Sequence, residues 1–246
     1  MPTDDRHSTA VDLLRAAAAR AKRNSVSFPP SFVIAADPGQ RPPLARMIQG
    51  GRGGEIRFKT YLSITMMATK APFDLRTSPT PAGWARLLAL PDDTGPRRVS
   101  TGLRWLRDNR FITLEPRPGR PPVITLLDPS GNSEKYARPS GQGRYVGVPV
   151  ELWTNGWILG LSSTALALLL VLIEHQGGHP GPRYLLSHRR ERYALSPDTW
   201  TKATKELVNH GLLTVSRTPQ GDEFDYRRLR NTYRVDPSVL KSTYPQ

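Results

Sequence analysis

The feature that most constrains the fold of this 246-residue chain is a segment that occurs twice, about 100 residues apart. Gly95–Leu114 (GPRRVSTGLRWLRDNRFITL) and Leu195–Val215 (LSPDTWTKATKELVNHGLLTV) both begin as an amphipathic helix and end as a strand. Two amphipathic segments can resemble each other by chance, but the order of elements around them is also shared. A repeat of this length predicts a duplicated domain rather than a solenoid of short units. The matched pairs, at a constant offset of 101 residues, are Val99 and Trp200, Leu106 and Leu207, Thr113 and Thr214, and Leu114 and Val215.

The second copy begins with a helix over residues 162–175 that is apolar on nearly all sides, which predicts a core helix. Ser162 or Ser163 is placed to cap its N-terminus. Residues 183–186 form a short strand candidate, and Ser187 can cap a second helix.

A third helix follows a break in the pattern. Ser196 is its expected N-cap, Pro197 suits its first position, and it runs to about Asn209. Residues 212–235 then predict a β-hairpin with its turn at 219–225 (PQGDEFD).

The first copy shows the same order more loosely. It departs by an enlarged turn, PDDTGP, and by Asn109-Arg110 where the second copy has His210-Gly211. The expected elements are an apolar helix at 60–69, a second helix within 80–90, a third within 95–109 and a hairpin within 110–128.

This order resembles the winged-helix family, a helix-turn-helix followed by a β-hairpin. The resemblance covers about Leu161–Val235 and, more loosely, Thr60–Asp128, and its main carrier is ALSPDTWTKATKELVNHGLLTV. It implies an α+β chain of two tandem winged-helix domains, each a three-helix core with a hairpin wing. Two such domains resemble plasmid replication initiators or transcriptional regulators of mobile elements. The family uses its third helix in the DNA major groove and its wing near the backbone. The fold also serves protein contacts, so a scaffold protein is the alternative from another class.

Composition changes suggest the domain boundaries. Residues 1–42 are expected to be a peripheral basic extension, helical over Val11–Arg23 and then proline-rich, and 129–144 a flexible Gly/Ser/Pro-rich linker. The winged-helix domains are then 43–128 and 145–240, with a tail at 241–246. The glycine-rich GGRGGE at 50–55 lacks the Lys-Ser/Thr of a phosphate-binding loop and is interpreted as flexible linkage.

The balance of charge predicts an anionic partner. Lys and Arg number 35 against 21 Asp and Glu, a net charge of +14 with a pI near 10.6. Nucleic acid is the first candidate partner and an acidic membrane surface the second. The chain has no cysteine, its N-terminus lacks the apolar core of a signal peptide, and its longest apolar run (165–173) is about half a membrane span. These features predict a cytoplasmic protein associated with double-stranded DNA, with no membrane partner.

Donors and small hydroxyls on the third helices and the wings are the candidate DNA contacts, and the arginines of SHRRER, near the second helix of the second copy, are candidate phosphate clamps. Arginine can pair with guanine, and Ser, Thr and Lys can contact bases or phosphates. A homodimer, or contacts with replication or transcription machinery, would add protein partners. The candidate residues are Arg97, Arg98, Ser100, Thr101, Arg104, Arg117, Arg120, Arg189, Arg190, Arg192, Thr199, Thr201, Lys202, Lys205, Arg217, Arg227, Arg228 and Arg230.

Enzymatic motifs are weak. Glu174, His175 and His179 lie in EHQGGH, where Gly-Gly breaks the helix that would hold both imidazoles on one face. Arg183, His188, Arg189 and Tyr193 have the residue types of tyrosine recombinases but crowd into eleven positions. We therefore expect no enzyme, no metal site and no cofactor.

Overall fold

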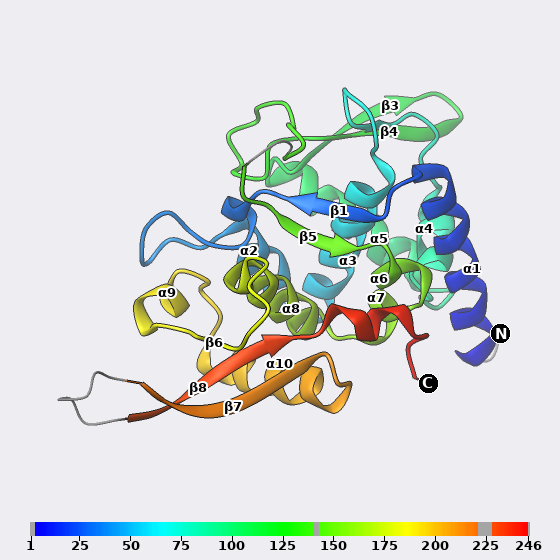
Figure 1. Ribbon diagram of the computed structural model, residues 1–246. Coiled ribbons are helices and arrows are strands. Elements are labelled where there is room, and N and C mark those ends of the chain that lie inside the picture. Colours follow the sequence, from blue (N-terminus) through cyan, green and yellow to red (C-terminus); the bar gives the residue numbers. More distant parts are fainter. Residues whose placement is uncertain (1–2, 140–142, 221–227, 246) are drawn as a thin grey trace.

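The structure is a computed structural model that describes residues 3–139, 143–220 and 228–245 (Figure 1). Helices and sheets are mixed, as an α+β chain requires. The helices are α1 (Thr3–Ala21), α2 (Pro43–Ile48), α3 (Arg52–Met67), α4 (Pro81–Leu87), α5 (Gly95–Asp108), α6 (Glu151–Thr154), α7 (Trp157–Gly160), α8 (Ser163–Gln176), α9 (Ser187–Glu191) and α10 (Pro197–Asn209), with 3-10 turns at Pro30–Phe32 and Pro237–Lys241. The strands are β1 (Ser25–Phe28), β2 (Asp74–Leu75), β3 (Ile112–Arg117), β4 (Arg120–Leu126), β5 (Val146–Pro149), β6 (Arg183–Tyr184), β7 (Leu213–Gln220) and β8 (Arg228–Val235).

The second half follows the order expected from the sequence: helix α8, strand β6, helices α9 and α10, and hairpin β7–β8. Ser162 caps α8 by accepting from the Ala165 N–H at 3.1 Å, and Ser196 caps α10 in the same way. The expected cap of α9 is wrong, because Ser187 is already inside the helix and Leu186 occupies the N-cap. The turn expected at 219–225 lies almost wholly outside the described residues.

The first half has the same order in α3, β2, α4, α5 and β3–β4. Its sheet has the order β2-β4-β3 and the second sheet β6-β8-β7, so in both the hairpin's second strand is central. The expected helix at 60–69 is longer than predicted and includes most of GGRGGE. Interpreting GGRGGE as flexible linkage was therefore wrong. A Cβ on Gly54 would lie 2.4 Å from the Ile48 carbonyl oxygen, so only glycine lets this helix start so close to α2.

The two copies form the same backbone turn where the third helix meets its strand. The Phe111 N–H donates to the Leu106 carbonyl at 2.9 Å, and the Leu212 N–H donates to the Leu207 carbonyl at 3.0 Å. Arg110 and Gly211 are both left-handed, with φ of 61° and 71°. The Asn109-Arg110 departure noted in the sequence therefore leaves the turn geometry unchanged.

Residues 1–42 contribute to the core, unlike the peripheral extension expected from the sequence. Leu14 of α1 and Phe32 are fully buried, and Val26 and Phe28 of β1 are buried as well. Strand β1 pairs antiparallel with β5, so the chain segment before the first copy pairs with the segment that opens the second. The two halves consequently share one hydrophobic core.

The described part of the expected linker is also packed. Tyr136 is 7% exposed, and its hydroxyl donates to the Ser27 carbonyl at 3.4 Å. Arg138 donates to the carbonyls of Ala68 and Thr69 at the C-terminal end of α3. These contacts differ from the flexible coil that the composition suggested.

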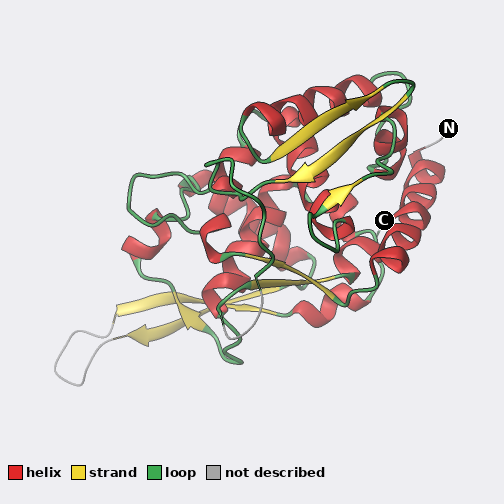
Figure 2. Ribbon diagram, turned by 90° about the horizontal axis from the view of Figure 1, so that it is seen from above, coloured by secondary structure: helices red, strands yellow, loops and turns green. Residues whose placement is uncertain are grey.

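The hairpins β3–β4 and β7–β8 lie at opposite ends of the molecule in both views (Figures 1 and 2). The β1–β5 ribbon lies between them. No helix in the described part of the chain combines the length and apolar character needed to cross a bilayer.

Candidate nucleic-acid interface

Helix α5 presents the most basic surface among the expected contact elements. Its buried residues Val99, Leu103 and Leu106 pack inward, which turns Arg97, Thr101 and Arg104 outward along one exposed stripe. Among the described residues, no carboxylate pairs with Arg97, Arg98 or Arg104, so these cations are available to an external anion. Ser100 and Thr101 donate to the carbonyls of Pro96 and Arg97. Their hydroxyl oxygens can still accept hydrogen bonds.

Helix α10 is less available than α5. Lys202 pairs with Asp198 at 2.9 Å on the surface, and Thr201 donates to the Pro197 carbonyl. Thr199 is occupied in the N-cap of the helix with Ser196. Lys205 is exposed and has no partner among the described residues.

Glu206 also belongs to α10 but does not face a ligand. Its carboxylate accepts from the Ser162 N–H at 2.7 Å and from the Ser162 hydroxyl at 2.6 Å. The two expected contact helices are therefore unequal, because α5 carries free arginines and α10 carries a single unpaired lysine.

The first hairpin places two arginines directly opposite each other at its tip. Arg117 of β3 pairs in register with Arg120 of β4. Like charges at opposed positions of a hairpin repel, so an anion bound between them would relieve the repulsion.

The arginines of the second hairpin differ in how exposed and how engaged they are. Arg217 is exposed, whereas Arg230 donates to the Tyr184 hydroxyl and lies over its ring at 5.1 Å. Arg227 lies outside the described residues. Arg228 is the first residue of β8, and its side chain also lies outside what is described.

The three arginines of SHRRER have internal partners. Arg189 makes two hydrogen bonds to the Glu174 carboxylate at 2.8 and 2.9 Å. Arg190 lies over the Trp200 ring at 4.7 Å, and Arg192 donates to the Ala35 carbonyl at 2.8 Å. Arg189 is thus engaged mainly with Glu174, whereas Arg190 and Arg192 keep further N–H donors that an anion could accept from. Their contact with phosphate stays a prediction.

Burial shifts the pKa values of Tyr193 and His175, which lie near Arg189. Burial and the Glu174 hydrogen bond raise the pKa of Tyr193. Burial, with Arg183 and Arg189 nearby, lowers the pKa of His175 to about 4. His175 is therefore neutral at physiological pH.

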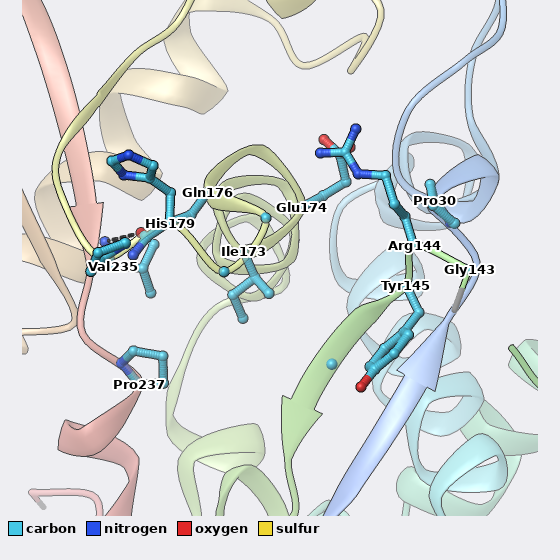
Figure 3. A pocket seen from close by; sticks show the side chains of 14 residues that line it. Pro30, Gly143, Arg144, Tyr145, Ile173, Glu174, Gln176, His179, Val235 and Pro237 are labelled. Atoms are coloured by element: carbon cyan, nitrogen blue, oxygen red, sulfur yellow. Dashed lines mark hydrogen bonds between the residues drawn. The ribbon is translucent and has the colours of Figure 1, made fainter. Parts of the chain in front are cut away.

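Two pockets of about 510 Å³ each lie on the surface. One is at the C-terminal end of α8 and is bordered by Arg144, Tyr145 and His179 (Figure 3). Its carboxylate, Glu174, is already held by Arg189, and the Gln176 side chain accepts from the Val235 N–H at 2.8 Å (Figure 3). Glu174 and Gln176 are thus used by the fold.

The other pocket lies between α3 and α5. Arg97, Arg98 and Thr101 line it together with Gly53 and Trp105, none of which is buried in the core. The three α5 residues are among the contacts expected from the sequence, whereas the contribution of α3 was not expected. Pairing α3 with α5 here depends on tertiary packing, and no local signal in the sequence indicates it.

Comparisons with protein-family models, with curated proteins and with solved structures found no significant match.

Proposed function

We propose that the protein binds double-stranded DNA sequence-specifically through two tandem winged-helix units, with α5 and the β3–β4 hairpin as the principal contact surface. The single observation that carries the proposal is the exposed row of α5, where Arg97 and Arg104 flank Thr101 and form no ion pair with the residues that the structure describes. Arginine and threonine on the outer face of a helix offer the donors that base edges and phosphates accept.

The equivalent order of elements in the two halves supports the winged-helix assignment. In each half a short strand, two helices and a hairpin follow a core helix, and the strand orders correspond. The net charge of +14 supports an anionic partner. Because α5 and α10 carry different side chains, we expect a binding site of about two helical turns that is not a true palindrome.

The test is a titration of the purified full-length chain against a random-sequence duplex of about 30 base pairs, followed by fluorescence anisotropy. With six or more phosphate contacts, the affinity should fall about a thousandfold between 50 and 200 mM salt. An affinity that stays constant over this range contradicts the proposal.

A charge-matched pair of variants separates the α5 surface from general basicity. Replacing both Arg97 and Arg104 by Gln should weaken binding at least tenfold. Replacing Arg41 and Lys241 by Gln removes the same charge from exposed positions elsewhere and should change binding much less. Equal losses from the two double variants would mean that net charge, and not α5, determines the affinity.

Replication initiation and transcriptional regulation both begin with this binding. Footprinting on the DNA that flanks the gene distinguishes them, because repeated sites near an origin favour an initiator and a promoter operator favours a regulator. A scaffold role predicts no protected DNA at all.

A further inference from the structure

We propose that the pocket between α3 and α5 binds a small organic anion of nucleotide size, a flat ring system that carries a phosphate or carboxylate group. The pocket volume of about 510 Å³ lies in the range of small-molecule sites. It borders the core at Ile56 and Trp105, and its lining includes α5 side chains expected to contact DNA.

The charge at the pocket selects an anion. Arg97 and Arg98 line it from α5, and neither pairs with a carboxylate among the described residues. The one carboxylate of the lining, Asp93, accepts from the Thr94 N–H at 2.8 Å and is thereby oriented toward its own chain. Arg57 adds a third cation, whose Nε donates to the Met47 carbonyl at 2.6 Å.

The apolar part of the lining is the half-buried indole of Trp105, since Ile56 is only 3% exposed. The Arg57 guanidinium lies 4.0 Å from the centre of the Trp105 ring, and the Phe111 ring stacks with it at 5.8 Å. These contacts hold the indole in place, and a bound ring would meet the part of it that stays exposed.

Gly53 offers a position from which the pocket can be obstructed. It lies in the first turn of α3 and lines the pocket. A Cβ on its neighbour Gly54 would clash with the Ile48 carbonyl, whereas a Cβ on Gly53 would meet no atom within 4 Å. A side chain can therefore be introduced at Gly53 without a backbone clash.

Occupancy would have a consequence for the proposed function. An anion held by Arg97 and Arg98 would neutralise two cations of the DNA-contact surface and should weaken duplex binding. This regulatory part depends on the proposed function, whereas binding of the ligand itself does not.

The probe is AMP, with adenosine as the neutral control and inorganic phosphate as the control without a ring. Calorimetry on the full-length chain should give a dissociation constant on the order of 100 μM or tighter for AMP. Adenosine and phosphate should each bind at least tenfold more weakly. Trp105 is half-buried while the other four tryptophans are buried, so AMP should change the intrinsic fluorescence. No saturable AMP binding, or equal binding of either control, overturns the proposal.

Three variants locate the site. Gly53→Leu should fill the pocket and abolish AMP binding without unfolding the chain, since leucine is the better helix former. Arg98→Gln should weaken AMP at least tenfold, and Arg107→Gln, an exposed position of α5 outside the pocket, should leave it unchanged. Circular dichroism and urea midpoints verify that each variant is folded. AMP binding that survives Gly53→Leu in a folded protein overturns this location.

A competition experiment separates this proposal from the proposed function. AMP added to the protein–duplex complex should release DNA from the wild type and not from Gly53→Leu. If AMP binds the pocket but DNA remains bound, the ligand site is upheld and the assignment of Arg97 and Arg98 to the DNA surface is overturned.

Discussion

At the scale of single residues, arginines of equal charge have opposite roles in this chain. Arg104 is exposed and unpaired with the described residues, whereas Arg189 compensates a carboxylate that is 7% exposed, Glu174. A buried carboxylate without a partner is costly, so Arg189 is needed by the fold.

Arg189→Ala should therefore destabilise the protein by about 3–5 kcal/mol, because it leaves Glu174 buried without its cation. The DNA affinity of the folded fraction should be unchanged. Arg217→Ala, at an exposed wing position, should have the opposite effect. Its free energy of unfolding should stay within about 0.5 kcal/mol of the wild-type value, and its duplex binding should be weaker. Urea unfolding and anisotropy measure the two effects. If Arg189→Ala weakened DNA binding at unchanged stability, the residue would be a phosphate contact after all.

His175 should make stability depend on pH. Its pKa is lowered to about 4 by burial and by Arg183 and Arg189, against an ordinary value near 6.5. Below about pH 6.5 His175 is protonated in the unfolded chain, but in the folded chain it stays neutral until about pH 4. The free energy of unfolding therefore falls as the pH decreases through this window.

The expected loss from this group is on the order of 1–3 kcal/mol. Urea unfolding between pH 7.5 and 4.5 measures it. His175→Leu should reduce the slope of the free energy of unfolding against pH. His179→Gln, at an exposed position, should leave this slope unchanged. Identical slopes for wild type and His175→Leu would remove His175 as the cause.

At the scale of elements, the two copies share geometry and differ in surface chemistry. Helices α5 and α10 both end three residues before a buried residue, Phe111 or Leu212, that directly precedes the strand. Among the described residues, however, Arg97, Arg98 and Arg104 of α5 have no carboxylate partner, whereas Lys202 of α10 is held by Asp198. Equivalent backbones therefore do not imply equivalent contacts.

Arg104→Ala should weaken binding to a selected site by about 1–3 kcal/mol more than binding to random duplex if the guanidinium contacts a base. Lys202→Ala should show the same preference with a smaller loss, because Asp198 already competes for the ammonium. Anisotropy with a site selected from random duplexes, and with the random pool, measures both. Equal losses on the two kinds of DNA would assign these helices to the backbone.

The turn after each third helix offers a matched pair of backbone substitutions. Arg110 adopts a φ of 61° that strains a residue with a Cβ, and Gly211 adopts 71° without strain. Arg110→Gly should therefore stabilise the protein by up to about 1 kcal/mol, and Gly211→Arg should destabilise it by about 1 kcal/mol or more. Urea unfolding tests both, and a shift of the same sign in the two variants would contradict the shared turn geometry.

At the scale of the whole molecule, the halves are joined by packing as well as by the connecting chain. Strand β1 pairs with β5, and Lys59 of α3, itself 6% exposed, donates to the Leu159 carbonyl of α7 at 3.0 Å. Helix α1 adds a further contact, because Arg15 donates to the Thr154 carbonyl at 2.9 Å.

Cleavage at a protease site inserted after residue 140 should consequently leave the two pieces associated. We expect them to elute together in size-exclusion chromatography and to keep the duplex affinity within about tenfold of the intact chain, since the shared core and not a tether holds them together. The uncut chain should unfold in one transition. Two separate folded pieces, or two transitions, would restore the model of independent domains on a flexible linker.

Local sequence was sufficient to predict the order of helices and strands within the two copies and the cap at Ser196, and it narrowed the cap of α8 to Ser162 or Ser163. Each of these depends on neighbours a few residues away, where helix periodicity, a capping hydroxyl or a turn residue acts directly. Tertiary structure alone decided which arginines face solvent, because the partners of Arg189 and Arg192 lie 15 and 157 residues away. It also decided that residues 1–42 complete the core and that α3 borders the pocket beside α5, since both depend on long-range burial that no local pattern encodes.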